Sequence, residues 1–230
     1  MIDATKTIDL VKLRFYIDYL YNKHVYDEGE SQYHKTLTTQ VVETYVDPLN
    51  LKSDAMILDL GCGPGYFLDE MQARGFTNTV GITLSAGDAE LCTSKGHTVK
   101  KCDLSFLPSK EGYIDESVDF IFLRHALEHS PYPIISLIEY NRVLKRDAKI
   151  YIEVPAPNCD RKHEYNQNHY SILGEHQLMA LLKRTGFVVE KFNKIEFDLA
   201  LGPNEDGTAN EVREVFYIII ASKKLSLDIK

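Results

Sequence analysis

One run of residues, 56–67, constrains the fold more than any other part of the chain. It reads Met-Ile-Leu-Asp-Leu-Gly-Cys-Gly-Pro-Gly-Tyr-Phe, an apolar stretch of strand length that breaks into spaced glycines and then continues with a helical pattern. Glycines lack the Cβ atoms that keep a ligand away from the backbone, and the first turn of a helix offers unpaired N–H groups. The run therefore predicts a strand, a tight turn and a helix start over which a nucleotide-like cofactor lies.

From residue 55 onward, the sequence alternates between strand-like and helix-like segments. Expected strands span 56–60, 78–82, 97–101, 118–123, 148–154, 187–195 and 214–221, and expected helices span 65–74, 86–95, 133–145 and 173–185. The first and fourth strands are nearly continuous apolar runs, as expected where helices cover both faces of a sheet. The alternation predicts an α/β fold with a doubly wound, mostly parallel, seven-stranded Rossmann-like sheet. Residues 198–212 join the last two strands without a helix, which predicts an antiparallel C-terminal hairpin strand.

Three parts of the chain differ in pattern. Residues 1–53 are expected to form an N-terminal helical cap or lid, 54–222 the cofactor-binding core, and 223–230 a tail. Within the core, residues 155–172 form a long polar and aromatic connection that leaves the fifth strand at the cofactor face. A connection of this length is more often functional than idle, so we expect a substrate loop there. An ordinary surface loop is the alternative.

Composition narrows the class of protein. The 230 residues are 44% hydrophobic and 26% charged, which is ordinary for a globular domain, and the net charge of −8 disfavours sequence-independent binding to nucleic acid. The longest apolar stretch, Val215–Ala221, is too short to cross a membrane, and no signal-peptide pattern opens the chain. The four cysteines have no CxxC spacing, so we expect neither a zinc knuckle nor disulfides. These features predict a cytoplasmic protein with a small-molecule partner, and they indicate no oligomeric state.

Several segments resemble the class I S-adenosylmethionine-dependent methyltransferases over roughly residues 54–222. They are Leu58-Asp59-Leu60-Gly61-Cys62-Gly63-Pro64-Gly65, Gly81-Ile82-Thr83-Leu84-Ser85, Cys102-Asp103-Leu104, Val118-Asp119-Phe120-Ile121 with His125-Ala126-Leu127-Glu128-His129, and Arg142-Val143-Leu144-Lys145. One glycine motif alone is weak evidence, whereas several segments in the right order and spacing are strong. The resemblance implies transfer of a methyl group from S-adenosylmethionine to a small-molecule oxygen, nitrogen or carbon nucleophile, leaving S-adenosylhomocysteine.

The resemblance also implies which residues hold the cofactor. The glycine turn would lie against the methionine part with Asp59 near its ammonium group, and Asp103 would accept the adenine amino hydrogens. A helix-capping role for Asp59 and a capping or turn role for Asp103 are the alternatives. The expected cofactor contacts are Asp59, Gly61, Cys62, Gly63, Gly65, Thr83, Leu84, Ser85, Asp103, Leu104 and Arg124.

Thr83 departs from the family pattern. Many members end the second strand with an acid that holds both ribose hydroxyls, and a carboxylate is a stronger partner for them than a threonine. The same absence, together with GxGxG rather than GxGxxG spacing, disfavours an NAD dehydrogenase. Ribose contacts would rest on Thr83, on backbone groups or on a residue that the sequence does not identify.

Two histidines, His125 and His129, follow the fourth strand at the cofactor face. Methyl transfer mainly requires alignment of the nucleophile and exclusion of water, but oxygen and carbon nucleophiles also need a base, and histidine suits this role. We expect either histidine to be that base, with a structural role as the alternative. Arg124 would bind a substrate carboxylate or phosphate, or pair with Glu128 four residues on, and the pairing is slightly favoured.

Other side chains are expected to contact the substrate. His169 and Tyr170 are the best-placed residues of the substrate loop. In the cap, apolar spacing predicts one helix over 8–24 and a second near 37–46, and Tyr26, Tyr33 and His34 are candidates to face the cofactor. A purely structural role for these tyrosines is equally compatible with the pattern.

Two rival functions remain. His125-Ala-Leu-Glu128-His129 matches the HxxEH pattern of a zinc hydrolase, but Pro131 and Pro133 leave little room for the helix that such a site needs, and no third ligand stands out. We therefore expect no metal. The second rival is a non-catalytic partner or regulatory subunit of another methyltransferase, which the threonine at position 83 keeps open.

Overall fold

The computed structural model describes residues 25, 27–107, 114–203 and 209–225. The helix expected over 8–24 and the candidate contact Tyr26 lie outside the described residues. Within them, none of the helices combines the length and the apolar character that a membrane span requires.

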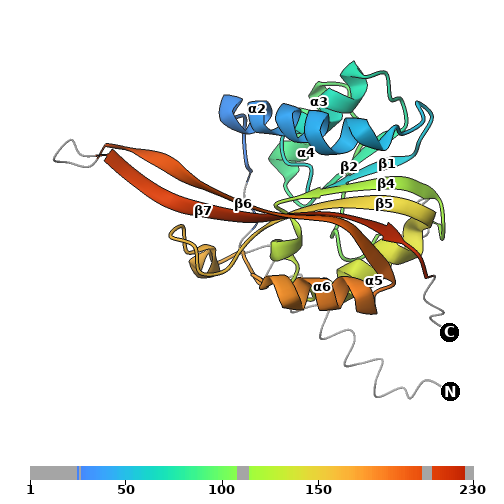
Figure 1. Ribbon diagram of the computed structural model, residues 1–230. Helices are drawn as coiled ribbons and strands as arrows, with labels where there is room; N and C mark the ends of the chain where they lie inside the picture. Colours follow the sequence, from blue (N-terminus) through green and yellow to red (C-terminus); the bar gives the residue numbers. More distant parts are fainter. Residues whose placement is uncertain (1–24, 26, 108–113, 204–208, 226–230) are drawn as a thin grey trace, which may run out of the picture.

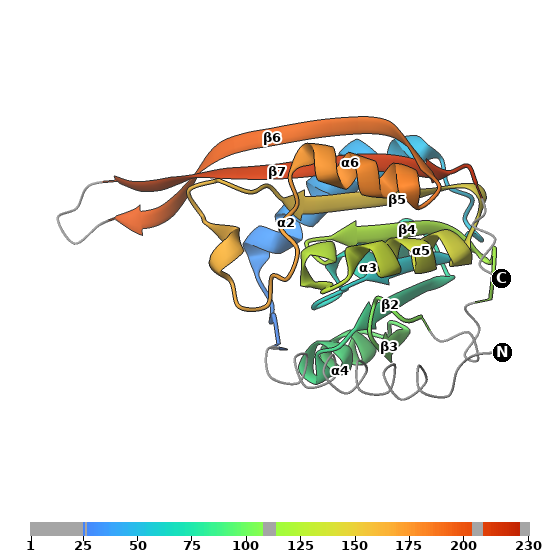
Figure 2. The same ribbon diagram turned by 90° about the horizontal axis from the view of Figure 1, so that it is seen from below.

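A seven-stranded sheet with the order β3-β2-β1-β4-β5-β7-β6 forms the middle of the molecule (Figure 1, Figure 2). The strands are β1 (Ile57–Leu60), β2 (Thr79–Thr83), β3 (Val99–Lys101), β4 (Val118–Arg124), β5 (Leu144–Pro155), β6 (Phe187–Pro203) and β7 (Ala209–Lys223). Strands β1 to β5 pair in parallel, whereas β7 lies antiparallel between β5 and β6. The predicted doubly wound, mostly parallel sheet with an antiparallel C-terminal strand is confirmed.

Helices cover both faces of this sheet (Figure 1). On one face lie α2 (Gln32–Val41), which continues through a π-helical turn (Val42–Val46) and a 3-10 turn (Asp47–Leu49), and α3 (Tyr66–Ala73); on the other lie α5 (Pro133–Val143) and α6 (Glu175–Arg184). Helix α4 (Ala86–Ser94) packs against β2 and β3. Two 3-10 turns, Leu127–His129 and His163–Tyr165, interrupt the connections after β4 and β5.

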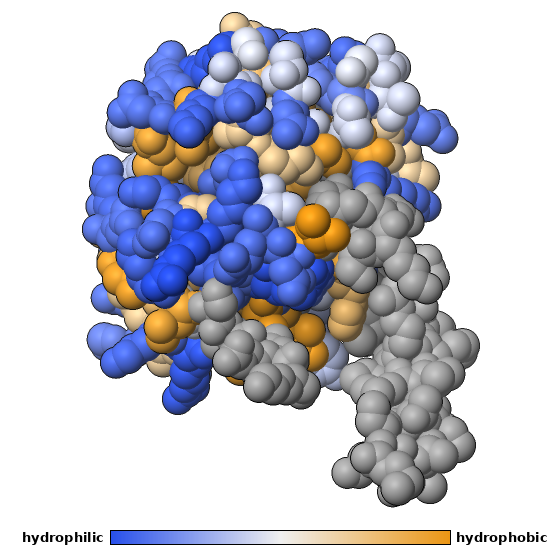
Figure 3. Space-filling view, turned by 90° about the vertical axis from the view of Figure 1, so that its right-hand side faces the viewer, coloured by the Kyte–Doolittle hydropathy of each residue, from blue (hydrophilic) through white to orange (hydrophobic). Residues whose placement is uncertain are grey.

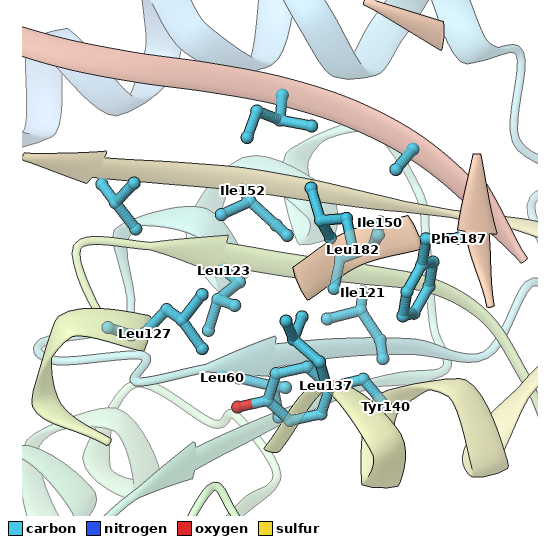
Figure 4. Packing of buried hydrophobic residues seen from close by; sticks show 14 of the residues in the cluster. Leu60, Ile121, Leu123, Leu127, Leu137, Tyr140, Ile150, Ile152, Leu182 and Phe187 are labelled. Carbon is cyan, nitrogen blue, oxygen red and sulfur yellow. The ribbon is translucent and has the colours of Figure 1, made fainter. Parts of the chain in front are cut away.

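An apolar layer on each face fixes the central strands. Between the sheet and helices α5 and α6, the side chains of Leu137 and Tyr140 on α5 point toward the strands (Figure 4). On the opposite face the rings of Phe67, Phe122 and Tyr151 form a stack with centroid distances of 3.9 and 4.8 Å. All residues of β1 are buried, as its continuous apolar run predicted. Burial on both faces therefore holds the carboxyl ends of β1 and β4 in one place.

Strands β6 and β7 are much longer than the sequence indicated. We expected 187–195 and 214–221, but the strands stay paired from Phe187 opposite Lys223 to Pro203 opposite Ala209, so the expected connection is largely strand. Residues 196–203 and 209–215, which we call the ribbon, project beyond the helical layers (Figure 1). The alternation of polar and apolar residues at 196–199 is the period of a strand, and a proline is tolerated at the end of an edge strand. Gly202 and Pro203 favour a loop when the sequence is considered alone, but strand pairing continues as far as Pro203.

The end of the molecule that faces away from the ribbon is mostly hydrophilic among the described residues (Figure 3). Hydrophobic residues lie there singly or in small groups between charged ones. The ligand-sized hollow lies at the other end, where the parallel strands finish.

Candidate active site

A cavity of about 410 Å³ lies beyond the carboxyl ends of β1, β2 and β4, and a smaller one of about 100 Å³ shares part of its wall. This is the edge at which open α/β sheets bind ligands. The wall of the larger cavity comes from the cap, the glycine turn, the residues at the ends of β2, β3 and β4, the 155–172 loop and the ribbon. The expected lid and substrate loop therefore both border the cavity. The volume falls in the range of about 300–1,000 Å³ that is usual for ligand pockets.

Glycine is required at the turn after β1. Gly61 has φ +77°, and a Cβ added to it would lie 2.5 Å from the Cβ of Ala126. Gly63 has φ +46°, and a Cβ there would collide with the carboxylate of Glu28. Both glycines line the larger cavity, so its wall at this point is bare backbone. Gly65 caps α3 with φ +83° and lines neither cavity.

Asp59 and Cys62 line the smaller cavity, together with Arg124. Asp59 is 3% exposed, and burial raises the pKa of its carboxyl well above the ordinary range. A cation in this cavity would favour the ionised form of the Asp59 carboxylate. The expected contact between Asp59 and an ammonium group requires that ionised form.

The end of β2 carries a chain of hydrogen bonds. The hydroxyl of Thr83 accepts from the backbone N–H of Ser85 at 3.1 Å, and the hydroxyl of Ser85 accepts from the N–H of Asp88 at 2.9 Å and donates to Asp27 at 2.7 Å. Thr83, Leu84, Ser85 and Asp88 line the larger cavity. Buried Asp88 thus places a carboxylate at the cavity five residues after the threonine, which the sequence analysis missed.

Asp103 occupies a turn after β3. It is 4% exposed, and its Oδ1 accepts from the backbone N–H of Ser105 at 2.8 Å, which is the turn role that the sequence left open. Its neighbours Cys102 and Leu104 line the larger cavity, but Asp103 itself does not. Of the expected cofactor residues, Asp103 and Gly65 are thus the two that border neither cavity.

Arg124 does not pair with Glu128, contrary to the interpretation that we favoured. Its Nε lies 3.1 Å from Oε1 of Glu153, the residue that faces it across β4 and β5, and its Nη1 lies 3.4 Å from the Thr38 hydroxyl. The chain after Arg124 turns instead of continuing as a helix, because His125 has φ +48°. Residues four apart therefore do not share a face here, as they would on a helix.

His125 belongs to the same buried charge network. Its Nε2 lies 2.9 Å from Oε1 of Glu153 and its Nδ1 lies 3.5 Å from Oε1 of Glu128. Burial lowers the pKa of His125, but the bonds to these carboxylates outweigh burial and raise the pKa to about 9. The ring therefore carries a positive charge at neutral pH, which is unsuited to the role of general base that we expected for it.

His129 and His169 face each other in the cavity wall. Their ring centroids are 4.9 Å apart, and Nδ1 of His129 donates to the carbonyl oxygen of Asn168 at 2.9 Å. Burial lowers the pKa of His169 to about 4, so this ring is neutral at pH 7. Tyr170 also lines the cavity, and its N–H donates to the carbonyl oxygen of Glu128 at 2.7 Å. The structure thus brings His129, His169 and Tyr170 together, as the sequence analysis expected.

The cap contributes Tyr33 and His34 to the same wall, although Tyr33 is 50% exposed. Glu28 from the cap lines both cavities. The ribbon contributes Phe197, Leu199 and Glu214, and Phe216 follows the ribbon in β7.

The sequence analysis missed the wall residues Glu28, Asp88, Phe197, Glu214 and Phe216, and it also missed Glu153, which contacts His125. Two of these residues could have been found from the sequence, because each is an acid near one end of an apolar strand. They are Glu153, near the end of β5, and Glu214, before the apolar run of β7. The cap residues and the aromatic residues Phe197 and Phe216 gave no such signal, because only the tertiary fold brings them to the cavity.

Comparison with known proteins agrees with this geometry. The architecture and the position of the cavity define a class I methyltransferase fold. The chain belongs to the family described as the methyltransferase domain, whose model matches residues 32–191. Members of this class use S-adenosylmethionine as cofactor.

Individual relatives differ in what they act on. The chain is 22% identical over 180 residues to the 27-O-demethylrifamycin SV methyltransferase of Amycolatopsis mediterranei, covering 73% of this chain and 66% of that protein, and 35% identical over 72 residues to EEF1A lysine methyltransferase 2 of Danio rerio, covering 31% and 30%. A SAM-dependent methyltransferase from Archaeoglobus fulgidus superposes with a TM-score of 0.65 and 19% identity, covering 91% of this chain and all of that one. The chain spans between 30% and 66% of the length of the curated relatives it matches.

Proposed function

We propose that this protein transfers the methyl group of S-adenosylmethionine to a small-molecule acceptor. One observation carries the proposal: a single cavity of about 410 Å³ has bare glycine backbone and the β2 turn on one side, and imidazoles and aromatic rings on the other. The first side suits the cofactor and the second suits an acceptor. Segments from many parts of the chain surround this space, which favours a small acceptor over a folded protein. The relative named for 27-O-demethylrifamycin SV supports the same choice, whereas the lysine methyltransferase matches over a shorter stretch.

The cofactor would lie across the glycine turn. Its ammonium group would meet Asp59, and its adenine would lie near Leu104, with Asp103 turning toward the amino group when the cofactor binds. The backbone N–H groups after β1 and the closed wall would align the acceptor with the methyl carbon and exclude water.

We assign to Glu28 the role of the acid that holds the ribose hydroxyls in many family members, where this chain has Thr83. Its carboxylate lies against Gly63, it lines both cavities, and its backbone N–H donates to Oδ2 of Asp88 at 3.1 Å. A carboxylate there could accept the two ribose hydroxyls that Thr83 cannot hold alone. The cap would thus complete the cofactor site.

Proton removal from the acceptor belongs to the opposite wall. The bond from Nδ1 of His129 to the Asn168 carbonyl requires the proton on Nδ1, so Nε2 carries a lone pair when the ring is neutral. His129 is therefore the candidate base.

Calorimetric titration with S-adenosylmethionine and S-adenosylhomocysteine tests the cofactor site. We expect binding by the intact protein and a loss of about 10- to 100-fold in Glu28→Gln, because a hydrogen bond to a charged group contributes about 1.5–3 kcal/mol. Glu30→Gln is the matched control: it removes the same charge two residues away, and Glu30 is 63% exposed and pairs with Lys95. Equal affinities in the two variants would refute the assignment of Glu28.

An acceptor screen then tests the reaction. Release of S-adenosylhomocysteine with phenolic, amine, sugar-linked or lipid-like acceptors would support the proposal. Methylation of proteins or nucleic acids alone would overturn it, and failure of the intact protein to bind the cofactor would favour a non-catalytic subunit.

A further inference from the structure

We propose that Glu128, His129 and His169 bind one divalent transition-metal ion of the zinc class at the acceptor side of the cavity. Each residue offers one ligand atom, and these atoms lie within 4.8 Å of one another. Two imidazole nitrogens and one carboxylate oxygen are a donor set of catalytic zinc sites, which keep a further position open. The proposal revises the expectation of no metal. It does not revive the HxxEH interpretation, because residues 127–129 form only a 3-10 turn and Nε2 of His125 pairs with Glu153.

Two buried atoms of this cluster have no hydrogen-bond partner among the described residues. They are Oε2 of Glu128 and Nδ1 of His169, and Glu128 is 1% exposed. A carboxylate oxygen and an imidazole nitrogen are costly to bury without a partner. His125 engages only the other oxygen of Glu128, Oε1. An ion between the two lone atoms would satisfy both.

Backbone hydrogen bonds hold the third ligand in place. The carbonyl oxygen of Glu128 accepts from the N–H groups of Tyr170 at 2.7 Å and Ser171 at 3.1 Å, and His129 donates to the carbonyl of Asn168. The residues on both sides of His169 are thus tied to the Glu128–His129 pair. The bond from His129 is also the outer-shell contact that metal-bound histidines usually make, and it leaves Nε2 to coordinate.

A second cluster nearby, Cys159, His163 and Glu214, has the same spacing but a different character. Its members satisfy one another, because Nε2 of His163 lies 2.8 Å from Oε1 of Glu214 and Sγ of Cys159 lies 3.7 Å from the same oxygen. We therefore assign the ion to the first cluster.

The consequence for the acceptor rests on the proposed function. An ion at this position would lower the pKa of an acceptor hydroxyl, so the acceptor class is a molecule with an ionisable hydroxyl, such as a phenol. The hydroxyl proton leaves to water, the oxygen lone pair forms the O–CH₃ bond, and the C–S bond breaks with its electron pair on sulfur. The products are the methyl ether, S-adenosylhomocysteine and one proton. With the ion bound, His129 is a ligand and not the base.

The test uses untagged protein stripped with a chelator and titrated with Co²⁺, whose visible absorption reports coordination, followed by displacement with Zn²⁺. We expect one ion per chain and an affinity that falls more than tenfold in His169→Ala and in Glu128→Gln. His176→Ala, at an exposed site on α6, is the control and should bind as the intact protein does, whereas His163→Ala reports on the neighbouring cluster. Circular dichroism shows whether each variant is folded, and His169→Ala, in a loop, tests the site without altering the buried carboxylate.

Two results would overturn the site: no stoichiometric binding by the intact protein, or loss of binding in His163→Ala with retention in His169→Ala. Cofactor titration of the metal-free protein separates this proposal from the proposed function. Cofactor binding without metal binding refutes the metal site alone, whereas metal binding without cofactor binding supports the site and counts against methyl transfer.

Discussion

The glycine at position 61 offers a sharp test of how the cofactor turn is built. Replacement by alanine forces a residue with a Cβ to adopt φ +77°, which costs about 1–2 kcal/mol. The new Cβ would also lie 2.5 Å from the Cβ of Ala126, a buried methyl group that cannot rotate away. Overpacking of this kind costs about 1–3 kcal/mol more. We expect Gly61→Ala to lower the free energy of unfolding by about 2–5 kcal/mol.

Gly75 provides the matched control. It has φ +84°, and nothing lies within 4 Å of a Cβ added to it, so Gly75→Ala should show the conformational cost alone. Equilibrium urea unfolding measures both variants, with equal slopes as the check that the denatured state is unchanged.

A double variant isolates the contact. Ala126→Gly removes the methyl group, and the next nearest atom, the Cα of Ala126, lies at an ordinary 3.7 Å. The destabilisation in Gly61→Ala/Ala126→Gly should therefore be smaller than the sum of the single changes by about 1–3 kcal/mol. Additive effects, or equal losses in Gly61→Ala and Gly75→Ala, would refute the reasoning and show that the turn relaxes freely.

Two further predictions concern stability. Burial raises the pKa of Glu153, but contacts with His125 and Arg124 outweigh burial and lower this pKa from an ordinary 4.5 to about 2. The ionised carboxylate therefore stabilises the fold above pH 4.5 by at most about 3 kcal/mol, and this contribution is lost as the pH falls toward 2. Acid unfolding of Glu153→Gln should lack that part of the pH dependence, and a profile equal to that of the intact protein would contradict the prediction. On α5, Leu137→Ala should lower the free energy of unfolding by about 2–5 kcal/mol because the Leu137 side chain is fully buried. Ile134→Ala, at a position 42% exposed, should change it by about 0.5 kcal/mol or less. Similar losses for the two variants in thermal or urea unfolding would contradict the packing of Leu137 against the sheet.

Parts of the site were predictable because they follow from local rules. A glycine turn after a buried strand and polar residues after neighbouring parallel strands meet at one edge of the sheet, which placed Thr83, His129, Gly61 and Gly63 at the cavity. Contacts between side chains on neighbouring strands do not follow from spacing along the chain. Arg124 meets Glu153 because β4 and β5 are in register, and a prediction from sequence spacing chose Glu128 instead.

The sequence by itself determined the order of strands and helices, the sheet type and the glycine turn, because hydrophobic periodicity and glycine positions act over a few residues. Only the tertiary structure decided the acceptor side of the cavity. There, the cap, the 155–172 loop and the ribbon meet from positions far apart in the chain, and backbone bonds from Glu128 to Tyr170 and Ser171 set His169 beside His129. Contacts of that range depend on how whole elements pack, and no spacing along the chain encodes them.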